Sequence, residues 1–476
     1  MDNQRLSGKS KLSYALGAVG KDMVYMLSAS YVLYYFQDLL GVEAWIMGVI
    51  LLAARVFDAF NDPIMGVVVA KTKTRWGKFR PWLLIGTVTN AVILYFMFAA
   101  PPAMDAKGLV AYAAIFYILW GVTYTMMDIP YWSMIPAFTQ GGRERENLTT
   151  IARSCAGVGA AIITVFTMML VPKLGAMFAG ENAGAKLIEV VGFKYFAAIV
   201  GVLFVLFITL TCINVKEKST ASMETVSVKQ MFKALVQNDQ AMTVTIAIVL
   251  VNTAIYITSN LVIYFFKYDF GTVGWNNAYV LFNTFGGAIQ ILAMMLFYPL
   301  LRKKFSNRSI FDICLGLAVL GYLVLLGLAF TNMSSVFVLF IPAFCIFSAN
   351  GILSVITTVF LANTVDYGEL KNGRRDESVI FSMQTFVVKL ASGIAALAAS
   401  ICLSVNKLSD EAITEEAKHV DWSLGVSASA KTGLRMTMTV IPILGLIFAF
   451  FWFRKKFILN DKKVEEIAAQ VKKLHE

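Results

Sequence analysis

Residues 193–215 read FKYFAAIVGVLFVLFITLTCINV, an apolar run whose only charged residue is Lys194. A transmembrane helix needs about 20 mainly apolar residues, so this run is long enough to cross a bilayer. Similar runs flank it on both sides. The predicted segments are residues 14–40, 44–70, 81–100, 109–136, 149–172, 193–215, 241–266, 274–301, 309–331, 335–362, 378–405 and 432–453. The sequence therefore predicts an all-α membrane protein with twelve transmembrane helices.

The composition agrees with a membrane protein. Of the 476 residues, 58% are hydrophobic and only 15% are charged, whereas soluble domains are about 25% charged. The net charge is +11, but 28 of the 41 Lys and Arg residues fall on one side of the predicted helices and seven on the other. This asymmetry follows the positive-inside rule. We therefore expect both termini in the cytoplasm and no nucleic-acid partner.

Several functional classes are excluded by what the chain contains. The five cysteines lack metal or redox spacing and are read as small core residues. Both histidines, His419 and His475, lie outside the predicted helices, which excludes histidine relays within the membrane. The sequence has no nucleophile–base pair, nucleotide motif or selectivity filter, so we expect neither an enzyme nor a channel.

The longest predicted cytoplasmic connection, residues 216–240, divides the helices six and six. It contains a short amphipathic turn around Val228–Leu235 that we expect at the membrane surface. Basic loops at 71–80 and 302–308 occupy the same place in each half, as in two repeats related along the membrane normal. We expect an N-terminal six-helix bundle (1–215), a central loop (216–240), a C-terminal six-helix bundle (241–455) and a cytoplasmic tail (456–476).

Eight charged side chains lie deep within the predicted helices, and each costs about 2.5–3.5 kcal/mol on insertion scales. Four are acids and four are bases, so they can pair or line water. They are Lys21, Asp22, Arg55, Asp58, Asp62, Asp128, Arg153 and Lys389. Seven of them lie in the first five helices. This concentration favours a functional site, because ion pairs that only held the two halves together would draw on both halves. A single member such as Arg153 could still be structural.

The second predicted helix contains ARVFDAFNDPIMG at residues 54–66. Asp58 and Asp62 are separated by one helical turn, and two carboxylates so placed repel each other unless a cation lies between them or one is protonated. Arg55 precedes Asp58 by three residues, and Asn61 adds a neutral carbonyl oxygen. The pattern predicts a site for a monovalent cation.

The fourth predicted helix places Tyr124, Asp128 and Trp132 on one face, at i, i+4 and i+8. A carboxylate accepts hydrogen bonds from sugar hydroxyls, and an indole ring covers the apolar face of a sugar. Lys21 and Asp22 point about 100° apart, so we expect them to reach different neighbours. The pattern predicts a sugar site.

Several longer strings resemble the melibiose/cation symporter branch of the glycoside–pentoside–hexuronide transporters, in the major facilitator superfamily. They are GKDMVYM (20–26), ARVFDAFNDPIMG (54–66), TRWGKFRPWLLIG (74–86), LWGVTYTMMDIPYWSMIP (119–136), DYGE (366–369) with RRDES (374–378), and SMQTFVVK (382–389). The resemblance covers nearly the whole chain. It implies the major-facilitator fold and symport of a glycoside with Na⁺, Li⁺ or H⁺, without a cofactor.

The resemblance also implies roles for single residues. The cation site would use Asp58, Asp62, Asn61 and Thr125, with Na⁺ held at Asp58 and Asp62. The sugar site would use Lys21, Asp22, Tyr124, Asp128, Trp132 and Arg153. Coupling and gating would use Arg55, Lys389, Asp366, Tyr367, Glu369 and Arg375. Two positions depart from the family pattern, namely Ser354 in place of a sugar-facing tryptophan and Asn363 in place of an aspartate.

Other interpretations remain open. One is a proton-coupled or exchange-type sugar carrier of the same fold, and another is a lysolipid or amphiphile transporter on the same scaffold. Retained Asn61 weighs against the first, and Asp128 with Trp132 and Arg153 weighs against the second. The expected partners are a small sugar, a monovalent cation and the lipid bilayer of the inner membrane, and we expect a functional monomer.

Overall fold

The computed structural model describes residues 6–138, 142–180, 182–215, 228–270, 274–331, 333, 335–373, 377–409, 413, 417 and 421–475. The chain falls into two compact units. Unit 1 comprises Met1–Thr225 with Ser409–Glu411, and unit 2 comprises Val226–Leu408 with Ala412–Glu476. The change of unit lies within the 216–240 connection, while the exact ends of the two predicted six-helix bundles stay a prediction.

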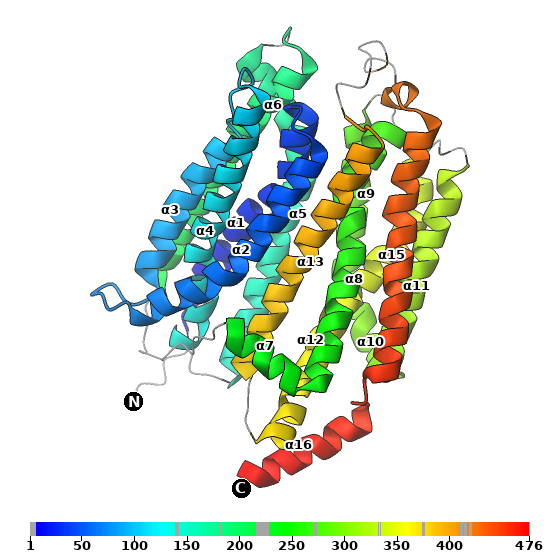
Figure 1. Cartoon of the computed structure of the whole chain (residues 1–476). Helices are drawn as coiled ribbons and strands as arrows, with labels where there is room; N and C mark the ends of the chain where they lie inside the picture. Colours follow the sequence, from blue (N-terminus) through cyan, green and yellow to red (C-terminus); the bar gives the residue numbers. More distant parts are fainter. Residues whose placement is uncertain are drawn as a thin grey trace. The chain divides into compact units, whose positions relative to one another are not determined.

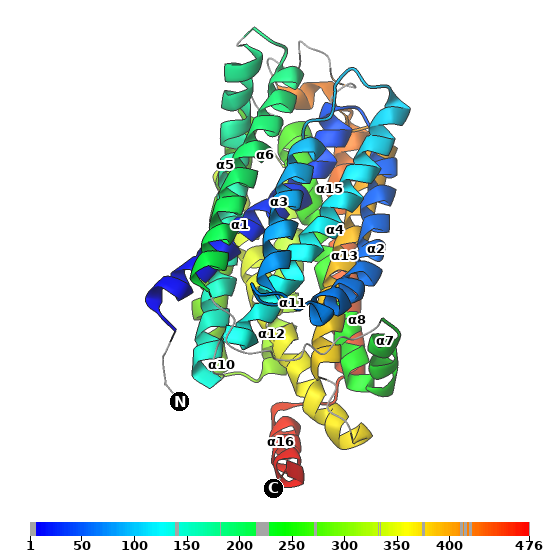
Figure 2. The same cartoon turned by 90° about the vertical axis from the view of Figure 1, so that its left-hand side faces the viewer.

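Unit 1 is a bundle of long helices that run side by side (Figures 1 and 2). Its helices are α1 (Gly8–Leu33), α2 (Ala44–Lys71), α3 (Arg80–Met97), α4 (Ala106–Phe138), α5 (Gly142–Ala179) and α6 (Ala185–Asn214). Helix α1 packs on α5 and α6, and α4 packs on α2 and α3. Gly86 lets α3 approach α4 closely, because a Cβ at this position would lie 2.7 Å from the Met127 backbone nitrogen. Helices α1, α2 and α4 thereby bring their charged residues into one unit.

Unit 2 contains the remaining long helices and two helices outside them. They are α7 (Val228–Gln237), α8 (Asp239–Tyr264), α9 (Trp275–Leu292), α10 (Tyr298–Arg302), α11 (Asn307–Ala329), α12 (Phe340–Asn372), α13 (Glu377–Val405), α15 (Ala428–Lys456) and α16 (Asp461–His475). Short α7 packs on α8 and α13. Helix α16, red in Figure 1, lies at the end of unit 2 against α12. Its Asp461 also pairs with Arg302 of α10 at 2.8 Å.

Each of the twelve predicted segments corresponds to a helix, with α9 and α10 sharing one segment. Within the described residues, eleven helices are long and apolar enough to cross a membrane. Helix α1 is not among the eleven, and it carries Lys21 and Asp22 side by side. Some predicted ends were wrong: α5 passes through Pro172 to Ala179, and α12 continues past 362 to Asn372. The extension of α12 is too polar to be recognised from hydropathy, whereas the extension of α5 is mostly apolar and lies beyond a proline inside the helix.

The first long helix of each unit ends in a π-helix. Helix α1 continues into η1 (Tyr34–Leu39), and α8 continues into η2 (Phe265–Phe270). The sequences leading into them are alike, YVLYYF at 31–36 and LVIYFF at 261–266. A third π-helix, η3 (Ala293–Phe297), separates α9 from α10. The shared turn supports the interpretation of the chain as two related halves.

Unit 2 contains buried charged residues that were not among the eight predicted inside the helices. Asp269 lies in η2 with a fully buried side chain, and Arg435 of α15 donates two hydrogen bonds to its carboxylate, at 2.6 and 2.7 Å. Lys267, which lies one residue beyond the predicted segment 241–266, is 1% exposed, and its Nζ lies 4.4 Å from the ring centroid of Trp422. The π-helix η2 extends α8 beyond the apolar run that was used to predict it. Lys267 and Asp269 lie in this extension, so the hydropathy of the sequence did not place them inside a helix.

Candidate functional site

The centre of the first cluster is Lys21 of α1, which is 4% exposed. Its Nζ lies 2.9 Å from Asp128 Oδ1 on α4 and 3.0 Å from Asp22 Oδ2, and it donates a hydrogen bond to Tyr124 Oη at 3.1 Å. Lys21 thus reaches α4, and the flexible stem of lysine also lets its ammonium bend back to the adjacent Asp22 carboxylate. One buried cation is therefore shared by two carboxylates.

Trp132 completes this cluster one turn beyond Asp128. Its Nε1 donates a hydrogen bond to Asp128 Oδ1 at 3.1 Å, which fixes the plane of the indole ring. The guanidinium carbon of Arg153, on α5, lies 4.2 Å from the ring centroid. Cation–π contacts of this kind are strongest on tryptophan. The six residues assigned to the sugar by the sequence are thus joined in one cluster of acceptors, donors and an aromatic face: Lys21, Asp22, Tyr124, Asp128, Trp132 and Arg153.

The second cluster surrounds Asp58 on α2. Arg55 lies one turn before it, with Nη1 3.1 Å from Asp58 Oδ2, and both side chains are buried. Arg55 Nη2 also donates a hydrogen bond to Tyr117 Oη on α4 at 2.9 Å. Gly121 of α4 makes room for the carboxylate, because a Cβ there would lie 2.9 Å from Asp58 Oδ1. Asp58 therefore carries a fixed counter-charge from its own helix.

Asp62 has a different partner. Thr125 of α4 donates its hydroxyl to Asp62 Oδ1 at 2.9 Å, so α2 and α4 bring together two members of the predicted cation site. Asn61 Nδ2 is buried and has no hydrogen-bond partner in the described part of the chain. Among the described residues, no three of His, Cys, Asp and Glu gather as metal ligands. A cation held here would therefore depend on carboxylates supplemented by neutral oxygens.

A stack of aromatic rings on α4 connects the two clusters, and the sequence reasoning missed it. Trp120 stacks on Tyr117 with centroids 5.8 Å apart and on Tyr124 with centroids 5.2 Å apart. The hydroxyl of Tyr117 contacts Arg55, and that of Tyr124 contacts Lys21. The only signal in the sequence is aromatic residues at i, i+3 and i+7, which is also the pattern of an ordinary apolar face. The stack joins the two clusters by direct contacts along one helix.

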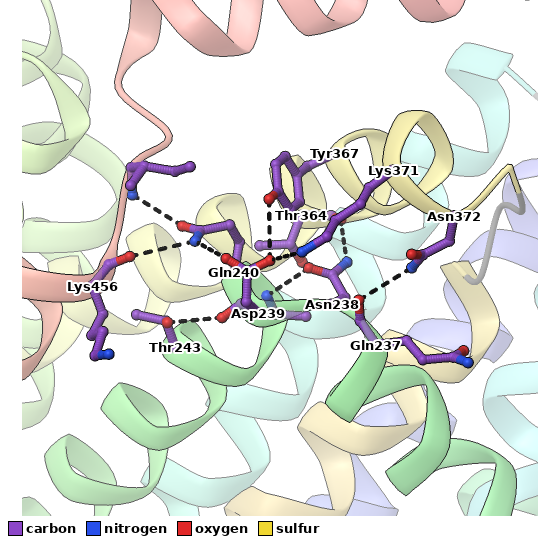
Figure 3. A network of polar contacts seen from close by, with 12 residues as sticks. Gln237, Asn238, Asp239, Gln240, Thr243, Thr364, Tyr367, Lys371, Asn372 and Lys456 are labelled. Carbon is purple, nitrogen blue, oxygen red and sulfur yellow. Dashed lines mark hydrogen bonds and ion pairs between the residues drawn. The ribbon is translucent and has the colours of Figure 1, made fainter.

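Three of the predicted gate residues, Asp366, Tyr367 and Glu369, lie near the end of α12 in unit 2, and Figure 3 shows Tyr367 with its neighbours. Tyr367 Oη donates a hydrogen bond to Asp239 Oδ1 at 3.1 Å, at the first residue of α8, and Lys371 forms an ion pair with the same oxygen. Asp366 and Glu369 lie on the same turn of α12, and Arg375 lies outside the described residues. The sequence missed Asp239 and Lys371, because both belong to connections in which charged residues are common.

A buried amide lies beside this ion pair. Asn238 caps α8 by accepting a hydrogen bond from the Ala241 backbone, and its Nδ2 donates to the Thr364 carbonyl of α12 at 2.8 Å. Gly368 permits this approach, since a Cβ there would lie 2.5 Å from Asn238 Nδ2. On the other side, Gln240 Nε2 donates to the Lys456 carbonyl (Figure 3). The start of α8 is thus tied to the ends of α12 and α15.

Two other predicted residues, Lys389 and Ser354, lie elsewhere in unit 2. Lys389 is half-buried on α13, and its part in coupling and gating stays a prediction. Ser354 Oγ donates a hydrogen bond to the Gly351 carbonyl at 2.7 Å and contacts Met294 Sδ in η3 at 3.5 Å. A π-helix often marks a functional position. The π-helix η3 thus contacts Ser354, the residue that stands where the family pattern has a tryptophan.

Comparison with known proteins identifies relatives along the whole chain. The model of the family described as MFS/sugar transport protein matches residues 13–461. The chain is 28% identical to a lactose permease of Lactobacillus delbrueckii subsp. bulgaricus, over 97% of this chain and 72% of that protein. It is 27% identical to the isoprimeverose transporter of Lactiplantibacillus pentosus, over 98% and 91%. It is 28% identical to the inner membrane symporter YicJ of Escherichia coli, over 82% and 81%.

Solved structures resemble the chain in fold. A bacterial homologue of the human lysosomal transporter Spinster matches with a TM-score of 0.68, covering 94% of this chain and 96% of that one. The sequence identity is 14%, so this likeness concerns the fold alone. The arrangement of helices is therefore that of a known class of transporters.

Proposed function

We propose a function from one established premise: this chain belongs to the MFS/sugar transport protein family. It is accordingly a multi-pass membrane transporter and not an enzyme, and as a sugar symporter of this type it uses no cofactor. Our proposal is that it carries a glycoside or oligosaccharide together with a monovalent cation, by alternating access. In transporters built from repeats, this mechanism exposes one site in turn to each side of the membrane.

The sugar part of the proposal is supported above all by Lys21, Asp128 and Trp132, which form one hydrogen-bonded unit. Such a unit offers a carboxylate acceptor, an ammonium donor and an aromatic ring within reach of one hexose. Arg153 lies over the Trp132 ring, so a sugar that stacks on this face must displace the guanidinium. Displacement would free Arg153 to donate hydrogen bonds to hydroxyl groups.

The cation part of the proposal assigns Na⁺, or Li⁺, to the oxygens of Asp58, Asp62, Asn61 and Thr125. Support comes from Thr125, which already contacts Asp62, and from Asn61, whose amide lies on the same helix as both carboxylates. Hard cations prefer such oxygen ligands. Arg55 and the aromatic stack of α4 would transmit occupancy of this site to Lys21.

Proton coupling is a second candidate, and one observation favours it. Arg55 contacts Asp58 Oδ2, which removes part of that carboxylate from the ligands available to Na⁺. A proton needs only one carboxylate, and Asp62 would suffice. In both cases we propose a functional monomer in the inner membrane. We also propose that both termini lie in the cytoplasm, which the positive-inside distribution supports.

The decisive experiment is uptake of radiolabelled α- and β-glycosides into vesicles that contain the purified protein, with an imposed Na⁺ gradient or proton gradient. Accumulation against a sugar gradient that depends on one of these cations supports symport and names the cation. Equilibration of sugar without accumulation under either gradient would contradict coupling. Calorimetric titrations add a check, since the factor by which the cation tightens sugar binding must equal the reverse factor.

A further inference from the structure

Helix α7 is a short helix outside the membrane spans with an unusual exposed face. Lys229, Phe232, Lys233 and Val236 follow one another at i, i+3, i+4 and i+7, so they lie on one side of the helix. All four are exposed, with Phe232 at 46% and Val236 at 70%, whereas Leu235 is buried toward the bundle. Exposed phenylalanine and valine side chains are unfavourable in water, and their combination with two lysines on the same face is typical of an interfacial helix.

The position of α7 agrees with the level of a membrane surface. It ends at Gln237, two residues before α8 begins its apolar span at Asp239. The ring of Phe232 packs edge-on against Phe386 of α13, 6.1 Å between centroids. Helix α13 crosses the membrane, so this contact places the exposed face of α7 beside a membrane-spanning helix.

The network of Figure 3 holds α7 in this position. Asn372 Nδ2, at the end of α12, donates a hydrogen bond to the Gln237 carbonyl of α7 at 3.4 Å. The next residue, Asn238, is buried and bonded to α12 through the Thr364 carbonyl. Helix α7 is therefore anchored at its C-terminal end to α12, and its exposed face is presented in a fixed orientation.

We propose that the face formed by Lys229, Phe232, Lys233 and Val236 is a binding surface for anionic phospholipid headgroups of the surrounding bilayer. Phe232 and Val236 enter the boundary of the acyl chains, and the lysine stems lie along the same boundary with their ammonium groups directed to phosphate. Charge complementarity selects anionic over zwitterionic lipid, because each basic residue near an anionic surface contributes about 1 kcal/mol.

Hydrogen–deuterium exchange of the full-length protein in nanodiscs tests this surface independently of transport. Discs of phosphatidylcholine alone are compared with discs that also contain phosphatidylglycerol. Amides of α7 should exchange more slowly in the anionic discs, by roughly thirty-fold for two lysines, about 2 kcal/mol. Lys229→Gln with Lys233→Gln should abolish the difference. Lys462→Gln with Lys463→Gln, on α16, removes the same charge elsewhere and should leave the difference unchanged.

A variant of the apolar part completes the design. Phe232→Ser should speed exchange of α7 in both kinds of disc, because the apolar contribution does not depend on headgroup charge. Equal exchange of wild-type α7 in both discs, or a difference that survives the double lysine variant, would overturn the proposal. Protection that appears only with two protein copies per disc would assign the face to a second copy of the chain and would also overturn it.

Discussion

Asp128 Oδ1 lies 2.9 Å from Lys21 Nζ and accepts the hydrogen bond of Trp132 Nε1 at 3.1 Å. A single carboxylate oxygen therefore orients both the buried ammonium and the indole ring. Loss of the charge at this position affects two candidate sugar contacts at once, although the shape of the side chain can be retained.

Asp128→Asn should weaken sugar binding by roughly ten-fold to a hundred-fold. A lost charged acceptor that leaves partners unpaired costs about 1.5–3 kcal/mol. Calorimetric titration of the purified protein measures the change. Asp105→Asn, in an exposed loop, is the control with the same charge change. If Asp128→Asn binds sugar as the wild type does, the substrate lies elsewhere and Asp128 is a structural partner of Lys21.

Asp58→Cys and Asp62→Cys should each abolish accumulation driven by a cation gradient and leave sugar binding or exchange measurable. The reason is that both carboxylates belong to the proposed cation site, whereas the sugar cluster lies around Lys21. Paired assays of accumulation and of exchange in vesicles separate the two activities. Normal accumulation by both variants would show that neither carboxylate binds the coupling cation.

Asn61→Ala should reduce stimulation by Na⁺ and leave proton-driven uptake largely intact. Na⁺ requires several oxygen ligands, and removal of one neutral ligand costs about 1 kcal/mol, roughly five-fold in affinity. The amide nitrogen is buried without a partner in the described part of the chain, so the substitution breaks no hydrogen bond there. The half-saturating Na⁺ concentration for uptake is the measurement, and an unchanged value would refute the assignment.

Lys371→Gln should change transport rate without lowering stability. The paired side chains of Lys371 and Asp239 are 44% and 51% exposed, and ion pairs so exposed contribute about 0–1 kcal/mol. Active accumulation should slow while sugar affinity and melting temperature stay close to wild type. The exchanged pair Asp239→Lys with Lys371→Asp should recover more activity than either single variant. Equal rates for the wild type, Asp239→Lys, Lys371→Asp and the exchanged pair would show that this ion pair has no part in gating.

Gly86→Ala should lower the melting temperature. The added Cβ would lie 2.7 Å from the Met127 nitrogen, and overpacking of this kind costs about 1–3 kcal/mol. Gly157→Ala on α5 is the matched control, because no heavy atom lies within 4 Å of its Cβ. The control should keep or raise the melting temperature, since alanine favours a helix over glycine by about 1 kcal/mol. Thermal unfolding in detergent compares them.

The twelve helices could be predicted because an apolar run of bilayer length has few alternative structures. Helix ends were less predictable. Helix α12 continues through DYGE to Asn372 because hydrogen bonds and packing in unit 2 stabilise a polar turn that hydropathy assigns to a loop. The buried ion pair of Asp269 and Arg435 was also missed. Its two members lie near helix ends and are 166 residues apart in the sequence, so no local pattern connects them.

Within the site, each charged residue inside a membrane helix could be recognised from the sequence, because a charge there has a high free energy of insertion. The partners of these residues were harder to predict. The hydrogen bond from Thr125 to Asp62 crosses from α4 to α2, so spacing along either helix could not predict it. Tyr117 and Trp120 carry no charge, and only the packed structure distinguishes a connecting stack from an ordinary apolar face.

Gln240 has a consequence for how the protein is made. This buried amide near the start of α8 accepts a hydrogen bond from the Ile458 backbone at 2.9 Å and donates to the Lys456 carbonyl, more than 200 residues later in the chain. A ribosome releases α8 long before it reaches those partners. During synthesis these two hydrogen bonds can therefore form only after α15, the last membrane helix, has been made. Truncation before Ile458 should leave a nascent chain that quality-control proteases recognise as unfinished.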